Sequence, residues 1–162
     1  MTSSTRNDLD RDIARAWLRA MRHDIWPAPF KYQQAVADLR QAATHPLDLA
    51  RTGAALAREA VEQFERCYSG LDEPALLALV LQGRGPANQL SPLLLAEMLE
   101  SLVAPEQRPL PLLLLELDKQ LRPVVPAVAA ALTVGLVRLQ VQREGGCPRA
   151  LEALVSWVEG VG

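Results

Sequence analysis

The sequence is poor in the residues that form disulfides and metal sites. Its 162 residues include only two cysteines and two histidines. Cys67 and Cys147 lie far apart and belong to no CxxC or Cys/His cluster, which argues against a secreted disulfide scaffold or a structural zinc site. His23 and His45 have no partner at the HxxxH or ExxH spacing of helical metal sites. We therefore expect neither a metal nor a cofactor.

Motifs of catalysis and nucleotide binding are missing as well. The sequence contains no GxSxG, no GxGxxG and no cysteine–histidine pairing that would suggest a nucleophile with its base. Because no set of polar residues converges in a pattern typical of an active site, we expect a protein that is not an enzyme.

A strong charge and a membrane-spanning segment are also lacking. The formal net charge of −2 gives no overall attraction to nucleic acid or to anionic membranes. The longest apolar stretch, 124–137, is shorter than the ~20 residues of a spanning helix, and Arg122 and Arg138 bracket it. The first residues show no apolar region of a signal peptide. We expect a cytoplasmic protein without a membrane association.

What the sequence does contain is a large apolar fraction built from leucine, alanine and valine. Hydrophobic residues make up 49% of the chain and aromatic residues only 4%. Leucine and alanine favour helices, and the twelve prolines would separate one helix from the next. No segment alternates with the period of a strand, so the sequence predicts an all-α, single-domain bundle of about seven or eight helices. This domain would span 8–162, after a disordered N-terminus at 1–7.

Periodicity and capping residues predict where several helices begin and how they are oriented. Asp8 or Asp10 can cap a first helix that runs to about Ile25, and Ser91 can cap a later one. Residues 124–143 form the most apolar helix, which we expect at the centre, and 112–121 form a short helix before it. The last helix follows Pro148 and is expected to bury four apolar residues: Leu151, Leu154, Val155 and Val158.

The first helix carries a stripe of four arginines, Arg11, Arg15, Arg19 and Arg22. At about 100° per residue they fall within a ~80° arc, opposite the apolar side of the helix. Such a stripe suits phosphates or carboxylates of a partner. Such a run of charge more often belongs to a solvated helix face, in which Asp8 would neutralise Arg11 and Asp12 would neutralise Arg15. Arg19 and Arg22 have no acid one turn before them.

Consecutive leucines form the second unusual feature. In 93–95 and 112–115 they cover more than one side of a helix, whereas a helix in a small monomer buries only part of its circumference. Either these helices are central, or a leucine side contacts another chain. The interface candidates are Leu93, Leu94, Leu113 and Leu114.

Together these features favour a helical accessory or adaptor subunit of a larger cytoplasmic complex in a bacterium. It would bind a protein partner, or a second copy of itself, through a leucine-rich face. Two alternatives stay open. One is a small helical subunit of a nucleoprotein assembly, as in a CRISPR effector, whose arginine stripe contacts the nucleic-acid backbone. The other is an accessory protein or chaperone of a secretion system.

Overall fold

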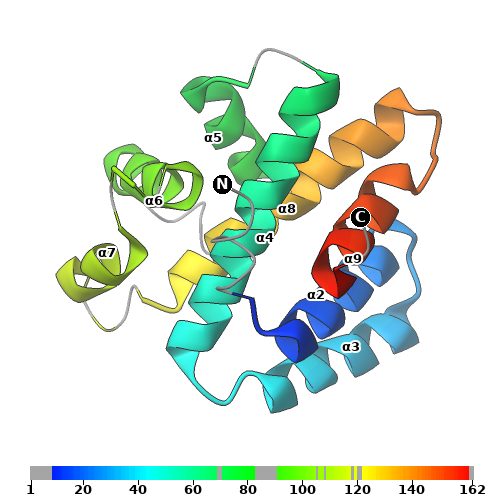
Figure 1. Cartoon of the computed structure of the whole chain (residues 1–162), viewed down its shortest axis with the longest axis horizontal. Helices are drawn as coiled ribbons and strands as arrows, with labels where there is room; N and C mark the ends of the chain where they lie inside the picture. Colours follow the sequence, from blue (N-terminus) through cyan, green and yellow to red (C-terminus); the bar gives the residue numbers. More distant parts are fainter. Residues whose placement is uncertain are drawn as a thin grey trace.

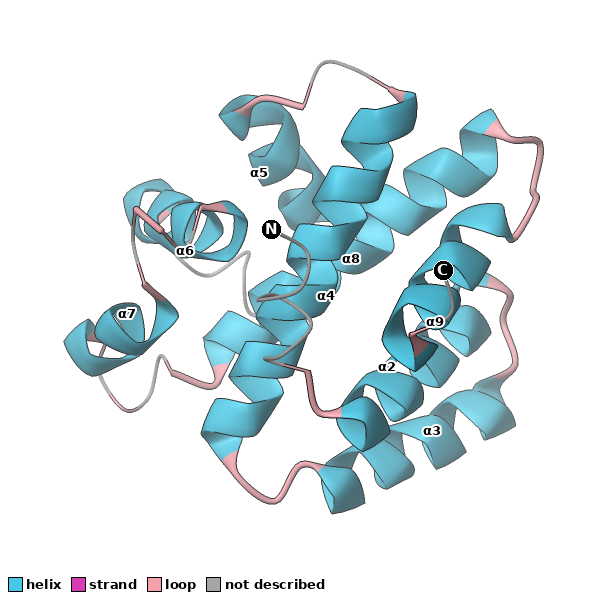
Figure 2. Ribbon diagram, in the orientation of Figure 1, coloured by secondary structure: helices cyan, strands magenta, loops and turns pink. Residues whose placement is uncertain are grey.

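The computed structural model confirms the predicted all-α class. It describes residues 9–68, 71–82, 91–104, 106–107, 109–117, 119 and 122–160, and these ranges contain eight helices and no strand (Figures 1 and 2). In chain order the helices are α2 Arg11–Ile25, α3 Pro29–Ala42, α4 Pro46–Cys67, α5 Glu73–Gln82, α6 Pro92–Val103, α7 Leu110–Glu116, α8 Val124–Arg143 and α9 Arg149–Glu159. The N-terminus predicted to be disordered, 1–7, lies outside the described residues.

Helix α8 occupies the centre of the bundle, as its apolar sequence predicted. It contacts α2, α4, α5, α6 and α9 (Figure 1). Ten of its residues are buried, among them Val128, Leu132 and Leu136. These side chains belong to one core cluster to which α2, α4 to α7 and α9 also contribute. The shared core explains why a helix with almost no polar side is stable here.

By length and composition alone, α8 is also the one helix in the described part of the chain that could cross a membrane. More than half of its most apolar segment is buried inside the bundle. Central helices of folded domains share this composition with spanning helices. The absence of a membrane association therefore stays a prediction.

Side-chain caps fix the beginnings of four helices: α2, α4, α5 and α6. On α5 the Asp72 carboxylate accepts a hydrogen bond from the backbone N–H of Ala75 at 2.9 Å. The Asp10 carboxylate accepts hydrogen bonds from the backbone N–H groups of Asp12 and Ile13, at 3.0 and 3.2 Å. The Ser91 hydroxyl accepts one from Leu94, at 3.2 Å. Ser91 was the predicted cap and Asp10 one of the two predicted candidates, because short polar side chains satisfy the free amides of a first helical turn. At the start of α4, His45 Nδ1 has the same role.

Helices α2 and α4 approach closely because α4 carries a glycine at their contact. A Cβ atom on Gly53 would lie only 2.5 Å from the Trp17 ring of α2. The backbone N–H of Asp10 also donates to the buried Thr52 hydroxyl, at 3.2 Å. This contact holds the apolar side of α2 against the core and leaves its arginine stripe facing outward.

Two local predictions were wrong. Helix α7 ends at Glu116 rather than 121, and Leu117 follows in an extended conformation. Val155 is exposed, although Leu151, Leu154 and Val158 are buried as expected. Val155 lies about 40° from Leu151 but about 100° from Leu154 around the helix, so it stands at the edge of the buried side and stays partly accessible.

Candidate functional site

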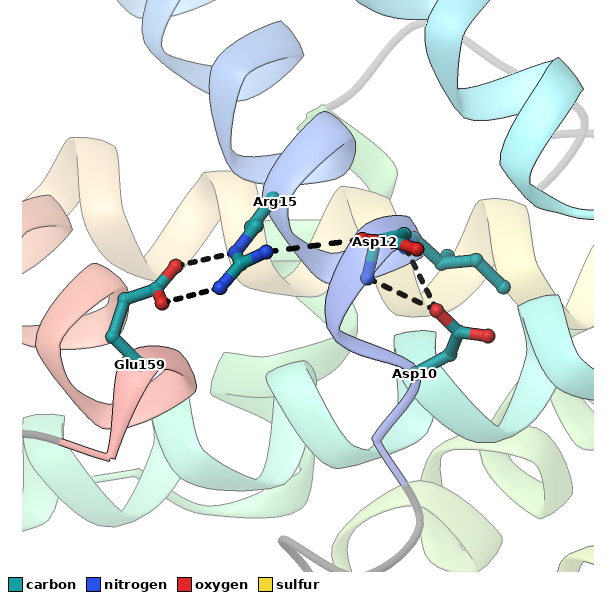
Figure 3. A network of polar contacts seen from close by, with 5 residues as sticks. Asp10, Asp12, Arg15 and Glu159 are labelled. Atoms are coloured by element: carbon teal, nitrogen blue, oxygen red, sulfur yellow. Dashed lines mark hydrogen bonds and ion pairs between the residues drawn. The ribbon is translucent and has the colours of Figure 1, made fainter.

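The four predicted arginines are all exposed along α2, but Arg15 is already engaged by α9. Its guanidinium group donates two hydrogen bonds to the Glu159 carboxylate, from Nε to Oε1 and from Nη2 to Oε2, both at 2.6 Å (Figure 3). The predicted partner Asp12 lies farther away, at 3.8 Å. A bidentate pair of this geometry orients both planar groups. The stripe is therefore part of the contact between α2 and α9.

This pair shifts the protonation of both side chains. The hydrogen bond and the charge of Glu159 raise the pKa of Arg15. The hydrogen bond from Arg15 lowers the pKa of Glu159, and the charges of Arg15 and Arg11 add to that effect. Each shift favours the charged form, as expected for a hydrogen-bonded ion pair.

The remaining arginines fall into two groups. Arg19 lies 3.5 Å from the Asp38 carboxylate of α3, a partner that was not predicted. Within the part of the chain that the structure describes, neither Arg11 nor Arg22 forms an ion pair. Asp24, the acid closest in sequence to Arg22, instead accepts a hydrogen bond from Arg138 at 2.8 Å.

A shallow, open groove of about 190 Å³ lies between α2 and α9, along the stripe. Apolar side chains from both helices line it, as do three of the four arginines. Its lining residues are Arg15, Leu18, Arg19, Arg22, Val155, Val158 and Glu159. Leu18 and Val158 are buried at the base, whereas Val155 is accessible. We call this site the α2–α9 groove.

The predicted leucine residues have different environments in α6 and α7. Leu93 is 74% exposed, but Leu94 is partly buried against the core and Leu113 is only 1% exposed. Leu113 is thus a core residue and does not belong to an interface. The side chain of Leu114 lies outside the described part.

Two other leucines of α7 are exposed: Leu112 by 53% and Leu115 by 73%. Helix α7 has only seven residues and is anchored mainly by α6. The two helices lie together on one side of the bundle, away from α9 (Figure 1). Leu113 points inward, and its neighbours at steps of about 100° must point elsewhere. We call Leu93, Leu112 and Leu115 the α6–α7 leucine face.

Sequence reasoning missed a buried carboxyl group in α4. The Glu59 side chain accepts a hydrogen bond from Gln63 at 3.3 Å, and Arg66 lies 3.6 Å away. Its second oxygen is buried without a hydrogen-bond partner among the described residues. Burial is the main cause that raises the pKa of Glu59. One signal was available, since Glu59 stands three residues after the buried Leu56 and shares its side of α4.

Within the described residues, no group of three histidine, cysteine, aspartate or glutamate side chains is arranged to hold a metal ion. The α2–α9 groove and the α6–α7 leucine face are two surface features of the described residues that offer groups to a partner. Comparisons of the chain with family models, with curated proteins and with solved structures found no match.

Proposed function

We propose that this protein is a non-enzymatic adaptor subunit that binds a partner protein through the α6–α7 leucine face. The observation that supports this proposal is the exposure of Leu93, Leu112 and Leu115 on two neighbouring helices. Covering a leucine side chain completely contributes roughly 1.5–3 kcal/mol. Three such side chains offer a partner a substantial apolar contact.

The shape of α7 supports a docking role. Among the described side chains of this helix, Leu113 lies in the core, whereas Leu112 and Leu115 face solvent. Leucines that are largely exposed contribute little to the stability of the isolated chain. Exposed leucines on two contacting helices are the kind of apolar surface that a partner protein can cover.

Binding to a nucleic-acid backbone has less support. The affinity of such binding increases with the number of arginines and lysines that contact phosphates. In this protein Glu159 and Asp38 already neutralise Arg15 and Arg19. Arg11 and Arg22 are the two members of the stripe that stay available, and they provide a small charge for this purpose.

The proposal is tested by replacing the exposed leucines and recovering the partner. We would purify the tagged chain from its host after nuclease treatment, as wild type and as the double variant Leu112→Asp, Leu115→Asp. We expect a stoichiometric protein partner with the wild type and its loss with the variant. Leu81→Asp is the matched control, because Leu81 is 48% exposed but lies on α5.

Three results would contradict the proposal: a partner that is retained by the double variant, a partner that is lost equally with Leu81→Asp, or association that nuclease abolishes. Circular dichroism of each variant shows that the helices are intact. Light scattering of the purified chain tells a second copy from a different partner.

A further inference from the structure

The α2–α9 groove combines an apolar base with a basic rim. Leu18 and Val158 form the base, and Val155 adds an accessible apolar side chain from α9. Arg19 and Arg22 lie along the α2 side. Apolar side chains bordered by guanidinium groups match a partner segment with apolar residues on one side and acidic residues beside them.

The groove already holds one carboxylate of the chain itself. Glu159 receives two hydrogen bonds from Arg15 at the end of the groove (Figure 3). Arg15 therefore shows how a guanidinium group of this stripe binds a carboxylate side-on. Arg22 lines the same groove and has no ion-pair partner among the described residues. Its guanidinium group is thus available to a carboxylate from outside.

From these observations we infer that the α2–α9 groove is a second binding site, which takes an acidic amphipathic helix of a partner protein. Apolar side chains of that helix would cover Val155, the accessible apolar side chain above the buried base of the groove. Its carboxylates would pair with Arg22 and compete with Asp38 for Arg19. This site is separate from the α6–α7 leucine face and does not depend on it.

The lining of the groove favours a peptide over a nucleic acid. Bases of single strands bind by stacking on aromatic rings, and no aromatic residue lines the groove. A phosphate backbone has no apolar part that could cover Val155. Carboxylates on an amphipathic helix, in contrast, place charge and apolar area side by side at i, i+3 and i+4 spacing.

The test uses a fluorescently labelled synthetic helix with leucines along one side and glutamates flanking them. A second peptide has every glutamate replaced by glutamine. Fluorescence anisotropy measures the affinity of the full-length chain for both. We expect the glutamine peptide to bind about tenfold more weakly, because its neutral side chains form no ion pair with Arg22.

Three variants and one control assign binding to the groove. Arg22→Glu should weaken binding of the glutamate peptide about tenfold or more, because it places like charges together. Val155→Asp should weaken it through the loss of apolar contact. Glu159→Gln should strengthen it severalfold, because Arg15 then loses its bidentate partner and keeps only the longer contact with Asp12 at 3.8 Å. Arg40→Glu makes the same charge change on an exposed arginine of α3 outside the groove and should leave affinity within about twofold.

The inference is overturned if the wild-type chain does not bind the peptide, or if Arg40→Glu weakens binding as much as Arg22→Glu. Tighter binding of a labelled single-stranded oligonucleotide, lost with Arg22→Glu, would also overturn it and favour a nucleic-acid partner. Thermal unfolding of each variant excludes loss of fold as the cause. The double variant Leu112→Asp, Leu115→Asp should bind the peptide normally, so the two proposals can fail separately.

Discussion

Helices α2 and α7 show two ways in which apolar sequence is used in this molecule. In α2, buried residues such as Ile13 and Trp17 alternate with exposed arginines at helical spacing, so the pattern alone tells which side faces inward. In α7, leucines occupy nearly every position, and only the fold tells that Leu113 points inward and Leu112 outward. The apolar residues predict a helix in both cases. The sequence shows which side of the helix faces the core only where apolar residues on one side are opposed by charged residues on the other, as in α2.

Substitutions of two neighbouring leucines of α7 test the difference between its two sides most directly. Leu113→Ala should lower the free energy of unfolding by about 2–4 kcal/mol, because it leaves a cavity in the core. Leu112→Ala should change it by less than about 0.5 kcal/mol, since that side chain is largely in solvent. Urea denaturation measures both. Equal effects would show that α7 does not have the inward and outward sides described here.

The next largest loss of stability is expected where the buried side of α2 packs against α4. Gly53→Ala adds a methyl group that would meet the Trp17 ring at 2.5 Å, so α2 and α4 must move apart. We expect a loss of about 1–3 kcal/mol, as is usual for overpacking. The control is Gly135→Ala in α8, where the nearest atom lies at a milder 3.3 Å. A variant Gly53→Ala as stable as the wild type would contradict the close approach of the two helices.

Glu59 shows how a carboxyl group on the buried side of α4 makes the stability of the fold depend on pH. Burial favours its neutral form, so the folded chain holds the proton more tightly than the unfolded chain. Glu59 therefore contributes stability at low pH, and that contribution is lost as the pH rises from the ordinary value of 4.5 through the raised pKa. Glu59→Gln removes the charge.

We expect Glu59→Gln to be more stable than the wild type at neutral pH by about 1 kcal/mol, the order of an unsatisfied buried group. The difference should vanish in acid, where the wild-type carboxyl is protonated as well. Urea denaturation at a series of pH values measures this. A constant difference at every pH would show that Glu59 does not titrate in the way proposed.

The features that the sequence could predict are those determined by nearby residues. The Asp10 and Ser91 caps each depend on a side chain and the amides that follow it within three residues. The central position of α8 follows from its lack of a polar side. These local rules also placed the arginine stripe on the outer side of α2.

The features that could not be predicted depend on contacts between distant segments. Arg15 binds Glu159, which is 144 residues away, and Arg19 pairs with Asp38 of another helix. No spacing rule links such positions, because the packing of α2 against α3 and α9 brings them together. The α2–α9 groove depends on the same packing. For this reason the sequence indicated a basic stripe but not the apolar base beside it.

The smallest change in stability is expected on the exposed side of α2, at the ion pair between Arg15 and Glu159. Glu159→Gln removes the carboxylate from Arg15, and we expect a slight fall in the melting temperature at neutral pH and low salt. Because the pKa of Glu159 is lowered in the fold, its contribution is present above the ordinary value of 4.5 and is lost as the pH falls through the lowered pKa.

High salt should abolish the difference, since both partners are exposed to screening ions. Glu65→Gln, the same change at an exposed position of α4, is the control and should have no such dependence on pH or salt. An effect of Glu159→Gln that persisted in high salt would mean that this pair holds α9 onto α2 as firmly as a core contact does. Arg15 would then be a structural residue, and Arg19 and Arg22 would be the arginines of the groove that a partner can engage.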